Sequence, residues 1–161
     1  MIFDGNAFIG EWPFRRLAHN TGEGLLRLMD RHGVDKAAVS SLFALFYKDC
    51  AVANRRLAEE IKGRGDRLIP VGTINPAFPG WEDDLKECVE LLGAKAIKLF
   101  PAYQQADQHS IVVFQQAVPN LVELKFDQPN HKLFQEFFQI LDILVEHKTG
   151  YCIFQLLHLV C

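Results

Sequence analysis

The chain has 161 residues, of which 49% are hydrophobic and 23% charged, and its formal net charge at pH 7 is −3. This composition is typical of a globular protein and excludes a largely disordered or fibrous chain. Because the charge is slightly negative, neither nucleic acid nor an anionic membrane surface is expected as the main partner. The length predicts a single domain over residues 1–161.

Targeting signals and cysteine usage indicate a cytoplasmic protein. The N-terminus, Met1–Gly5, lacks the basic region and apolar stretch of a secretory signal, and no apolar run reaches the roughly 18 residues of a membrane span. The cysteines have irregular spacing and no C-x-x-C pair. We therefore expect reduced and mostly buried thiols rather than a disulfide framework or a zinc site.

The first predicted elements follow the order strand, helix, strand. A β-like run over Ile2–Ile9 opens the chain. Thr21–His32 follows as an amphipathic helix, and Gly33 is expected to end it because glycine adopts the left-handed conformation that closes helices. Lys36–Leu42, with the sequence KAAVSSL, is the second predicted strand.

The same alternation continues through the next fifty residues. Asp49 is placed to cap a second helix that runs through Lys62, and Arg67–Asn75 is the third predicted strand. Pro79–Leu92 is predicted as a third helix, since its acidic first turn suits the positive end of the helix dipole. Ala94–Phe100 is the fourth predicted strand.

Strands that alternate with helices at a spacing of about 30 residues indicate right-handed βαβ crossovers and a parallel sheet. Two α/β architectures fit this pattern. One is a partial TIM-barrel-like (β/α) fold with about five βα units, and the other is an open parallel α/β sheet.

The alternation breaks at about 101–130 and then returns. This segment is rich in glutamine and predicts an irregular insert, within which Ile111–Gln116 and Leu121–Phe126 are a candidate hairpin. His131–His147 is predicted as an amphipathic helix, and Tyr151–Leu157 as the fifth strand of the series.

Four segments carry a resemblance to a known family. In chain order they are Asp4–Gly10 (DGNAFIG), Gly33–Val39 (GVDKAAV), Asp66–Pro76 (DRLIPVGTINP) and Gly93–Pro101 (GAKAIKLFP), with Asn54 inside the second helix. Their order and spacing resemble the N-terminal half of an amidohydrolase-related TIM barrel, in the branch of metal-dependent hydrolases and decarboxylases. The resemblance covers residues 1 to about 103 and resumes over 131–157.

The resemblance implies chemistry at the carboxyl ends of the barrel strands. It also implies an Asp-x-His-x-His motif on strand one, whose histidines hold a divalent metal such as zinc. Here the matching residues are Asp4, Asn6 and Phe8, so both histidines are missing. A further family histidine falls at Gln155, with His158 three residues on. We therefore predict no resident metal and no other cofactor.

The candidate pocket residues are polar side chains on or near strand ends: Asp4, Asn6, Asn75, Lys98, Gln155 and His158. Asp4 and Asn6 share one face of strand one, and Lys98 is suited to bind a carboxylate. A structural ion pair for Lys98 and a turn-capping role for Asn75 stay open. Ser40 ends strand two outside any G-x-S-x-G elbow, so serine-hydrolase chemistry is not expected.

Length is the second departure from the family, because a TIM barrel typically has about 250 residues. Three explanations stay open: a fragment or truncated product, an open sheet, and a protomer that completes its core by self-association, which we expect. The expected parent activity is hydrolysis of amide or ester bonds, or decarboxylation of a small carboxylate, impaired in this chain. The alternative is a non-catalytic binding or scaffold protein, or a truncated gene product.

Overall fold

The computed structural model of the chain describes residues 1–106, 109 and 152–154. In this part of the chain, five strands form one sheet in the order β1-β2-β3-β4-β5. They are β1 (Phe3–Ile9), β2 (Lys36–Ser41), β3 (Leu68–Thr73), β4 (Ala96–Leu99) and β5 (Cys152–Phe154). The first four pair in parallel, which confirms an α/β fold with a parallel sheet.

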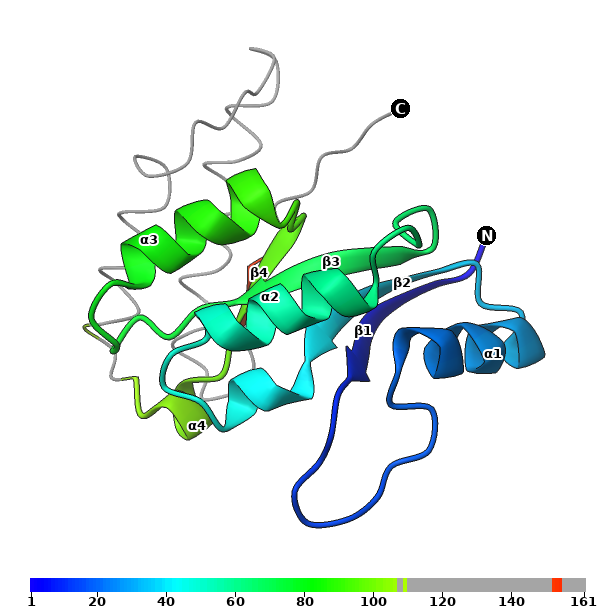
Figure 1. Cartoon of the computed structure of the whole chain (residues 1–161), viewed down its shortest axis with the longest axis horizontal. Coiled ribbons are helices and arrows are strands. Elements are labelled where there is room, and N and C mark those ends of the chain that lie inside the picture. Colours follow the sequence, from blue (N-terminus) through cyan, green and yellow to red (C-terminus); the bar gives the residue numbers. More distant parts are fainter. Residues whose placement is uncertain (107–108, 110–151, 155–161) are drawn as a thin grey trace.

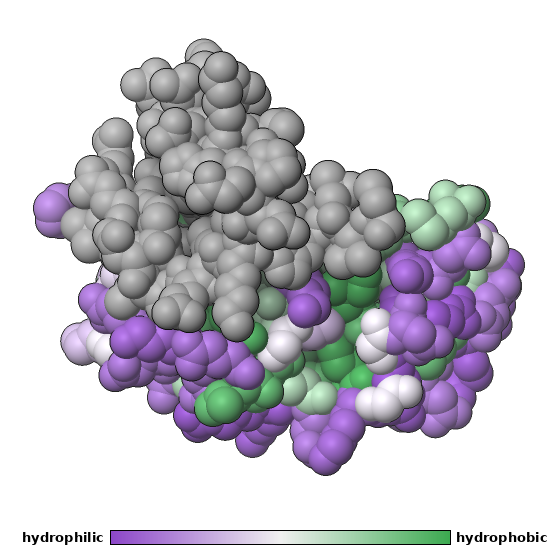
Figure 2. All heavy atoms as spheres, turned by 90° about the horizontal axis from the view of Figure 1, so that it is seen from above, coloured by the Kyte–Doolittle hydropathy of each residue, from purple (hydrophilic) through white to green (hydrophobic). Residues whose placement is uncertain are grey.

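The helices lie on one face of this sheet (Figure 1). They are α1 (Gly22–His32), α2 (Ala51–Glu60) and α3 (Trp81–Lys86), and a short α4 (Pro101–Gln104) follows β4. The main core is made by residues of β1–β3 that pack against residues of α1 and of α2 with its C-cap: Ala7, Ile9, Leu25, Met29, Ala37, Val39, Leu57, Ile61 and Leu68. Seen from above, the described surface is largely polar, with apolar residues in a band bordered by polar ones (Figure 2).

Helix α1 forms where the sequence predicted it. Thr21 is the N-cap, and its Oγ1 accepts a hydrogen bond from the Gly24 amide at 3.0 Å. Gly33 ends the helix with a φ of 67°, a left-handed conformation that L side chains rarely adopt. Residue chemistry at the two ends therefore sets the bounds of this helix.

The ends of other elements differ from prediction. The second strand stops at Ser41, because Leu42 begins a 3₁₀ turn over Leu42–Leu45. The second helix begins at Ala51, with Cys50 at the N-cap position, and the predicted capping bond of Asp49 is made to the Ala51 amide at 2.9 Å.

The third helix is shorter than the predicted Pro79–Leu92. Its α-helical part spans Trp81–Lys86, and a π-helical turn over Glu87–Leu91 completes it. A π turn widens the backbone spiral, so the later residues face the sheet at a different angle from that of a continuous α-helix. The amphipathic pattern that predicted one uniform helix therefore spans two helix types.

The prediction of a parallel fifth strand is wrong. β5 pairs antiparallel with β4, with Leu99 opposite Cys152 and Ile97 opposite Phe154. Parallel neighbours need a crossover connection that carries the chain back to the opposite end of the strands, whereas antiparallel neighbours need none. The described part of the sheet therefore contains four parallel strands rather than five, and β5 runs toward the amino ends of the others.

Two buried side-chain amides take the place of strand neighbours near the carboxyl ends of β3 and β4. Asn54 of α2 donates to the Thr73 carbonyl oxygen at 2.8 Å and accepts from the Thr73 amide at 2.9 Å. Gln104 of α4 accepts from the Phe100 amide at 2.9 Å and donates to the Ile74 carbonyl oxygen at 2.8 Å. Each side-chain amide both donates and accepts, as a peptide group does, and so satisfies backbone groups that have no hydrogen bond to a neighbouring strand.

Several predictions from the later sequence lie outside the described residues. They are the candidate hairpin at Ile111–Gln116 and Leu121–Phe126 and the helix at His131–His147. Among the helices that the structure does describe, not one is both long and apolar enough to cross a lipid bilayer.

The paired hydrogen bonds of Asn54 lead to a stability prediction. Asn54→Ala leaves the buried N–H and C=O of Thr73 without partners, so the free energy of unfolding should fall by about 2–4 kcal/mol. Urea denaturation followed by circular dichroism measures this change. Val52→Ala, at an exposed position of the same helix, is the matched control and should change stability by less than about 0.5 kcal/mol. An equal loss of unfolding free energy in the two variants would contradict a stabilising role for the two hydrogen bonds of Asn54.

Candidate functional site

The candidate site lies on the face of the sheet opposite the helices. Side chains alternate along each strand, and Ala7, Ile9, Ala37 and Val39 point toward α1 and α2. Their neighbours point to the other face, where Ala38, Val71 and Ala96 form a small apolar cluster. By the same alternation, this face receives four further side chains near the carboxyl ends of β1–β4: Phe8, Ser40, Thr73 and Lys98.

Lys98 reaches across this face from one strand to another three places away. Its Nζ donates a hydrogen bond of 2.7 Å to Asn6 Oδ1 on β1, although β2 and β3 lie between the two strands. In a flat sheet β4 and β1 would be about 14 Å apart, which exceeds the reach of a lysine side chain. The sheet is therefore curled, and this face is its concave side.

The surroundings of the Lys98 ammonium are largely apolar. The residue is 3% exposed, and its Nζ lies 4.4 Å from the ring centroid of Phe8 and 6.0 Å from that of Phe100. Lys98 has no ion-pair partner within the described part of the chain. Burial lowers the pKa of Lys98 to about 8, and the Asp4 carboxylate opposes this shift. Both the cation and the neutral amine are consequently populated near neutral pH.

Two hydroxyl groups on this side of the sheet are buried without partners. Ser40 and Thr73 are each 0% exposed, and neither Ser40 Oγ nor Thr73 Oγ1 has a hydrogen-bond partner among the residues described. A buried hydroxyl without a partner is costly, so native proteins rarely keep one without a reason. Both hydroxyls therefore keep unused hydrogen-bonding capacity on the face that also carries Lys98.

A β-bulge places Asn6 in front of Lys98. β1 advances from Asp4 to Ala7 while its partner β2 advances only from Ala37 to Val39, so β1 contains one extra residue. Asp4 Oδ1 accepts from the Asn6 amide at 2.9 Å and holds this turn of the strand. Asn6 is exposed and Lys98 is buried. The ammonium is therefore approached from the side of Asn6.

The six predicted pocket residues do not all meet. Asp4, Asn6 and Lys98 come together as expected, with Asp4 acting on Lys98 through its charge. Asn75 is instead committed to the backbone, since it donates to the Lys48 carbonyl oxygen at 3.2 Å and accepts from the Ala77 amide at 3.1 Å.

Gln155 and His158 lie outside the described residues. Both were placed at the pocket on the premise that the fifth strand is parallel, and that premise does not hold.

Thr73 and Phe100 were missed from the sequence. Thr73 follows Val71 by two residues and so shares its face, which makes it a polar residue at a core position of an otherwise apolar strand. That pattern was the available signal. There was no comparable indication for Phe100 in the sequence, because phenylalanine residues at strand ends are commonly buried in the core.

The buried thiols offer no competing chemistry. Cys50 and Cys88 are free and buried, and burial raises the pKa of each thiol to about 12. A thiol with such a pKa stays protonated at neutral pH and is a poor nucleophile and metal ligand. The expectation of reduced, buried cysteines is thus confirmed for these two residues.

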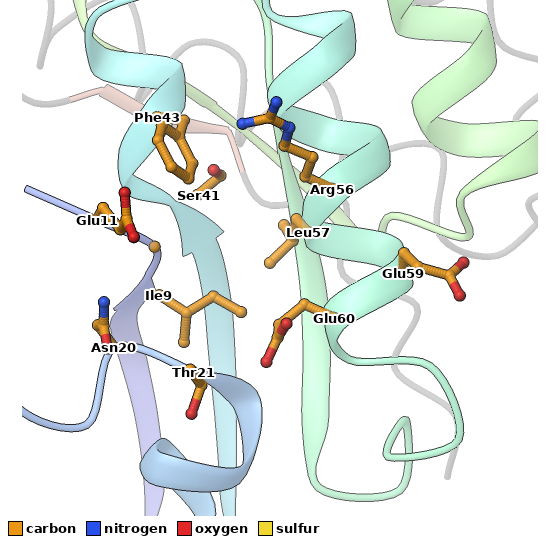
Figure 3. A pocket seen from close by; sticks show the side chains of 11 residues that line it. Ile9, Glu11, Asn20, Thr21, Ser41, Phe43, Arg56, Leu57, Glu59 and Glu60 are labelled. Atoms are coloured by element: carbon orange, nitrogen blue, oxygen red, sulfur yellow. The ribbon is translucent and has the colours of Figure 1, made fainter.

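A cavity separate from the Lys98 site lies between the carboxyl ends of β1 and β2 and helices α1 and α2 (Figure 3). Its volume is about 510 Å³, and Ile9, Leu57 and Phe43 supply its apolar wall. Three of its polar side chains have structural partners: Glu60 accepts from the Gly22 amide at 2.9 Å, Thr21 caps α1, and Arg56 lies 5.3 Å from the Phe43 ring centroid. Since Figure 3 shows Glu59 pointing away from the cavity, it leaves few free groups for a ligand.

The divalent metal implied by the resemblance does not fit the residues at its position. Asn6 Oδ1 accepts a hydrogen bond from the Lys98 ammonium, which would repel a metal cation, and Phe8 offers no donor atom. In residues 1–106, 109 and 152–154, no three His, Cys, Asp or Glu side chains lie close enough together to hold a metal ion. Where the resemblance implies a metal cation, this chain has the ammonium group of Lys98 beside Asn6.

Comparison with known proteins leaves the family open, since no protein-family model matches the chain and no curated protein matches its sequence.

The burial of Lys98 makes stability depend on pH. The pKa of about 8 in the folded chain lies below the ordinary value of 10.5. Between these values the unfolded chain binds more protons, so stability should rise as pH rises through this window. Lys98→Met removes the buried charge and should raise the free energy of unfolding at pH 7 by roughly 1–3 kcal/mol. Urea denaturation at several pH values measures both effects.

Comparison with an exposed lysine controls for the general effect of charge. Lys95 lies on the same segment and is exposed, so Lys95→Met should change stability by less than about 0.5 kcal/mol at any pH tested. The advantage of Lys98→Met should shrink toward pH 10.5, where the native lysine is neutral. An advantage that stays constant over the whole range would contradict the burial of a charged amine.

Proposed function

We propose that this chain is a barrel-type α/β protein related to the amidohydrolases, in which a lysine replaces the metal and binds a small carboxylate. In this proposal β1–β4 are the first four units of a TIM-barrel-like arrangement. The parent activity, hydrolysis of an amide or ester bond or decarboxylation, is impaired because the metal ligands are replaced. Binding of the carboxylate is the activity that remains.

The observation that carries the proposal is the Lys98 ammonium held by Asn6 on the concave face. An ammonium has three donors, and Asn6 takes one of them. The Coulomb attraction between a buried cation and an entering anion is strengthened by the low local dielectric, and the anion also relieves the cost of burying an unpaired charge. A carboxylate is a small anion whose two oxygens can accept from the remaining donors.

The neighbouring hydroxyls support a carboxylate rather than a simple halide. Ser40 Oγ and Thr73 Oγ1 are buried without partners in the described part of the chain and lie on the same face as Lys98. Each hydroxyl can donate one hydrogen bond. The rings of Phe8 and Phe100 border the ammonium and suit a short apolar group attached to the carboxylate.

The site also lies where ligands bind in this class of fold. Ser40, Thr73 and Lys98 are within the last two residues of their strands. In parallel α/β sheets and barrels, ligands bind at the carboxyl ends of the strands, because the loops there vary without disturbing the core.

Titration with lactate tests the proposal. Lactate added to ¹⁵N-labelled protein should shift the backbone amide signals of Asn6, Ser40, Thr73 and Lys98. Lys98→Met should weaken binding roughly tenfold or more, because a charge-assisted hydrogen bond is lost, whereas Lys95→Met should bind as the wild type does. Affinity should fall as pH rises above about 8, since the ammonium is then deprotonated. Equal affinity in the wild type and Lys98→Met would refute the site.

A second candidate function, a self-associating scaffold, is favoured by the outer edge of β1. Among the described strands β1 has one neighbour, β2. Phe3, the first residue of this strand, is 42% exposed, and Ile2 just before it is 56% exposed. An exposed apolar edge strand can pair with the same strand of a second copy and so extend the sheet.

Sedimentation velocity at several protein concentrations tests the scaffold function. The wild type should form dimers or larger species at micromolar concentration. Phe3→Lys places a charge on the edge and should shift the distribution toward the monomer. Phe14→Lys, at an exposed aromatic residue outside the strand, is the control and should leave the distribution unchanged. A wild type that stays monomeric throughout would contradict edge pairing.

A further inference from the structure

We infer that Lys98 is a nucleophilic lysine that forms an imine with a small 2-oxo carboxylate bound on the concave face. This inference rests on the proposed carboxylate site and adds a covalent step to it. The ligand class changes from any small carboxylate to one with a carbonyl group next to the carboxylate.

The first argument is that the amine has no anionic partner to hold it as a permanent cation. Surface lysines are solvated or paired with carboxylates and remain protonated at neutral pH. Lys98 is buried, and its one hydrogen-bond partner in the described residues is the neutral amide oxygen of Asn6. The pKa of about 8 follows from this environment and leaves a useful fraction of neutral amine. A desolvated lysine in an apolar pocket is one of the recognised ways to make a nucleophilic amine.

The second argument is positional. A carboxylate that binds the Lys98 ammonium brings the adjacent carbonyl carbon of a 2-oxo acid close to Nζ. The side of Nζ toward Asn6 leads to solvent, because Asn6 is exposed while Lys98 is buried. Ser40 and Thr73 supply hydroxyls on the same face that can hold the carboxylate while the amine reacts. Each part of the ligand therefore has a chemically matched group.

The step balances without any oxidant or reductant. The lone pair of the neutral Nζ attacks the carbonyl carbon and forms the C–N bond, and one amine proton moves to the carbonyl oxygen. The resulting carbinolamine loses this oxygen as water, which carries the second amine proton away, and the C=N bond forms. Protonation of the imine restores a cation at the position of the ammonium, next to the carboxylate.

Borohydride trapping on the full chain tests the inference. Pyruvate is the probe, and sodium borohydride reduces any imine to a stable secondary amine that intact mass and peptide mapping detect. One adduct per chain is expected, located at Lys98. Lys98→Met should lose this adduct, and Lys95→Met should retain it. Lactate, which has no carbonyl group, should slow the trapping by competing for the site.

A second variant reports on the amine rather than on folding. Asn6→Asp places a carboxylate against Nζ and should favour the charged form, so the pH of half-maximal trapping should move upward by about one unit or more. Among the described residues of the native chain, Asp4 is the charged group that raises the pKa of Lys98. Asp4→Asn should therefore move the pH of half-maximal trapping downward. Unchanged pH profiles in both variants would overturn the inference.

The outcomes separate the inference from the proposed function. Lactate binding without a pyruvate adduct on Lys98 would overturn the imine and leave the carboxylate site in place. Absence of both would overturn both. Trapping that occurs at the same rate on urea-unfolded chain, or equally on Lys95, would also overturn the inference, because the fold would then contribute nothing to the reactivity.

Discussion

The hydrogen bond between Lys98 and Asn6 is the interaction on which the concave face depends. It joins the first and fourth strands of the sheet directly, so it requires that the two intervening strands curl between them. The same bond joins a buried cation, which lies next to two aromatic rings, to a neutral amide oxygen. Curvature of the sheet and burial of the amine are therefore two aspects of one geometric arrangement.

The helices stabilise this arrangement from the opposite side. Asn54 and Gln104 each satisfy two backbone groups near the strand ends, and Asn75 joins two loops at the same end of the sheet. Without such bonds the carboxyl ends would carry buried peptide groups with no partner. The backbone of Thr73 is held in this way, although its hydroxyl makes no bond of its own.

The sequence predicted the parts of this fold that depend on local pattern. Thr21 and Gly33 mark the ends of α1 by their own chemistry, and the alternation of short apolar runs with helices indicated four parallel strands. It also named Asp4, Asn6 and Lys98 among its candidate residues, and the structure brings these three together. It missed the bulge in β1, because one extra residue in a strand is defined only by its pairing with β2.

The reversed direction of β5 was beyond local reasoning for a similar reason. The side-chain pattern of a strand does not determine whether the strand runs parallel or antiparallel to its neighbour; this depends on how the chain connects the two strands. Likewise, the missing partners of Ser40 and Thr73 are a property of the assembled face. The role of Gln104 depends on backbone groups of Phe100 and Ile74 that a sequence does not show to be unpaired.

The antiparallel strand has a further consequence for how such a fold can grow. A parallel βα series can be extended step by step, because each added unit offers the next one an edge of the same polarity. β5 offers an edge of the opposite polarity beside Ile97–Leu99. The series of parallel strands therefore ends at β4 on that side of the described sheet. A further strand beside β5 that ran parallel to β1–β4 would pair with β5 in the antiparallel sense, so the outer side of β1 is the edge at which the parallel series can continue directly.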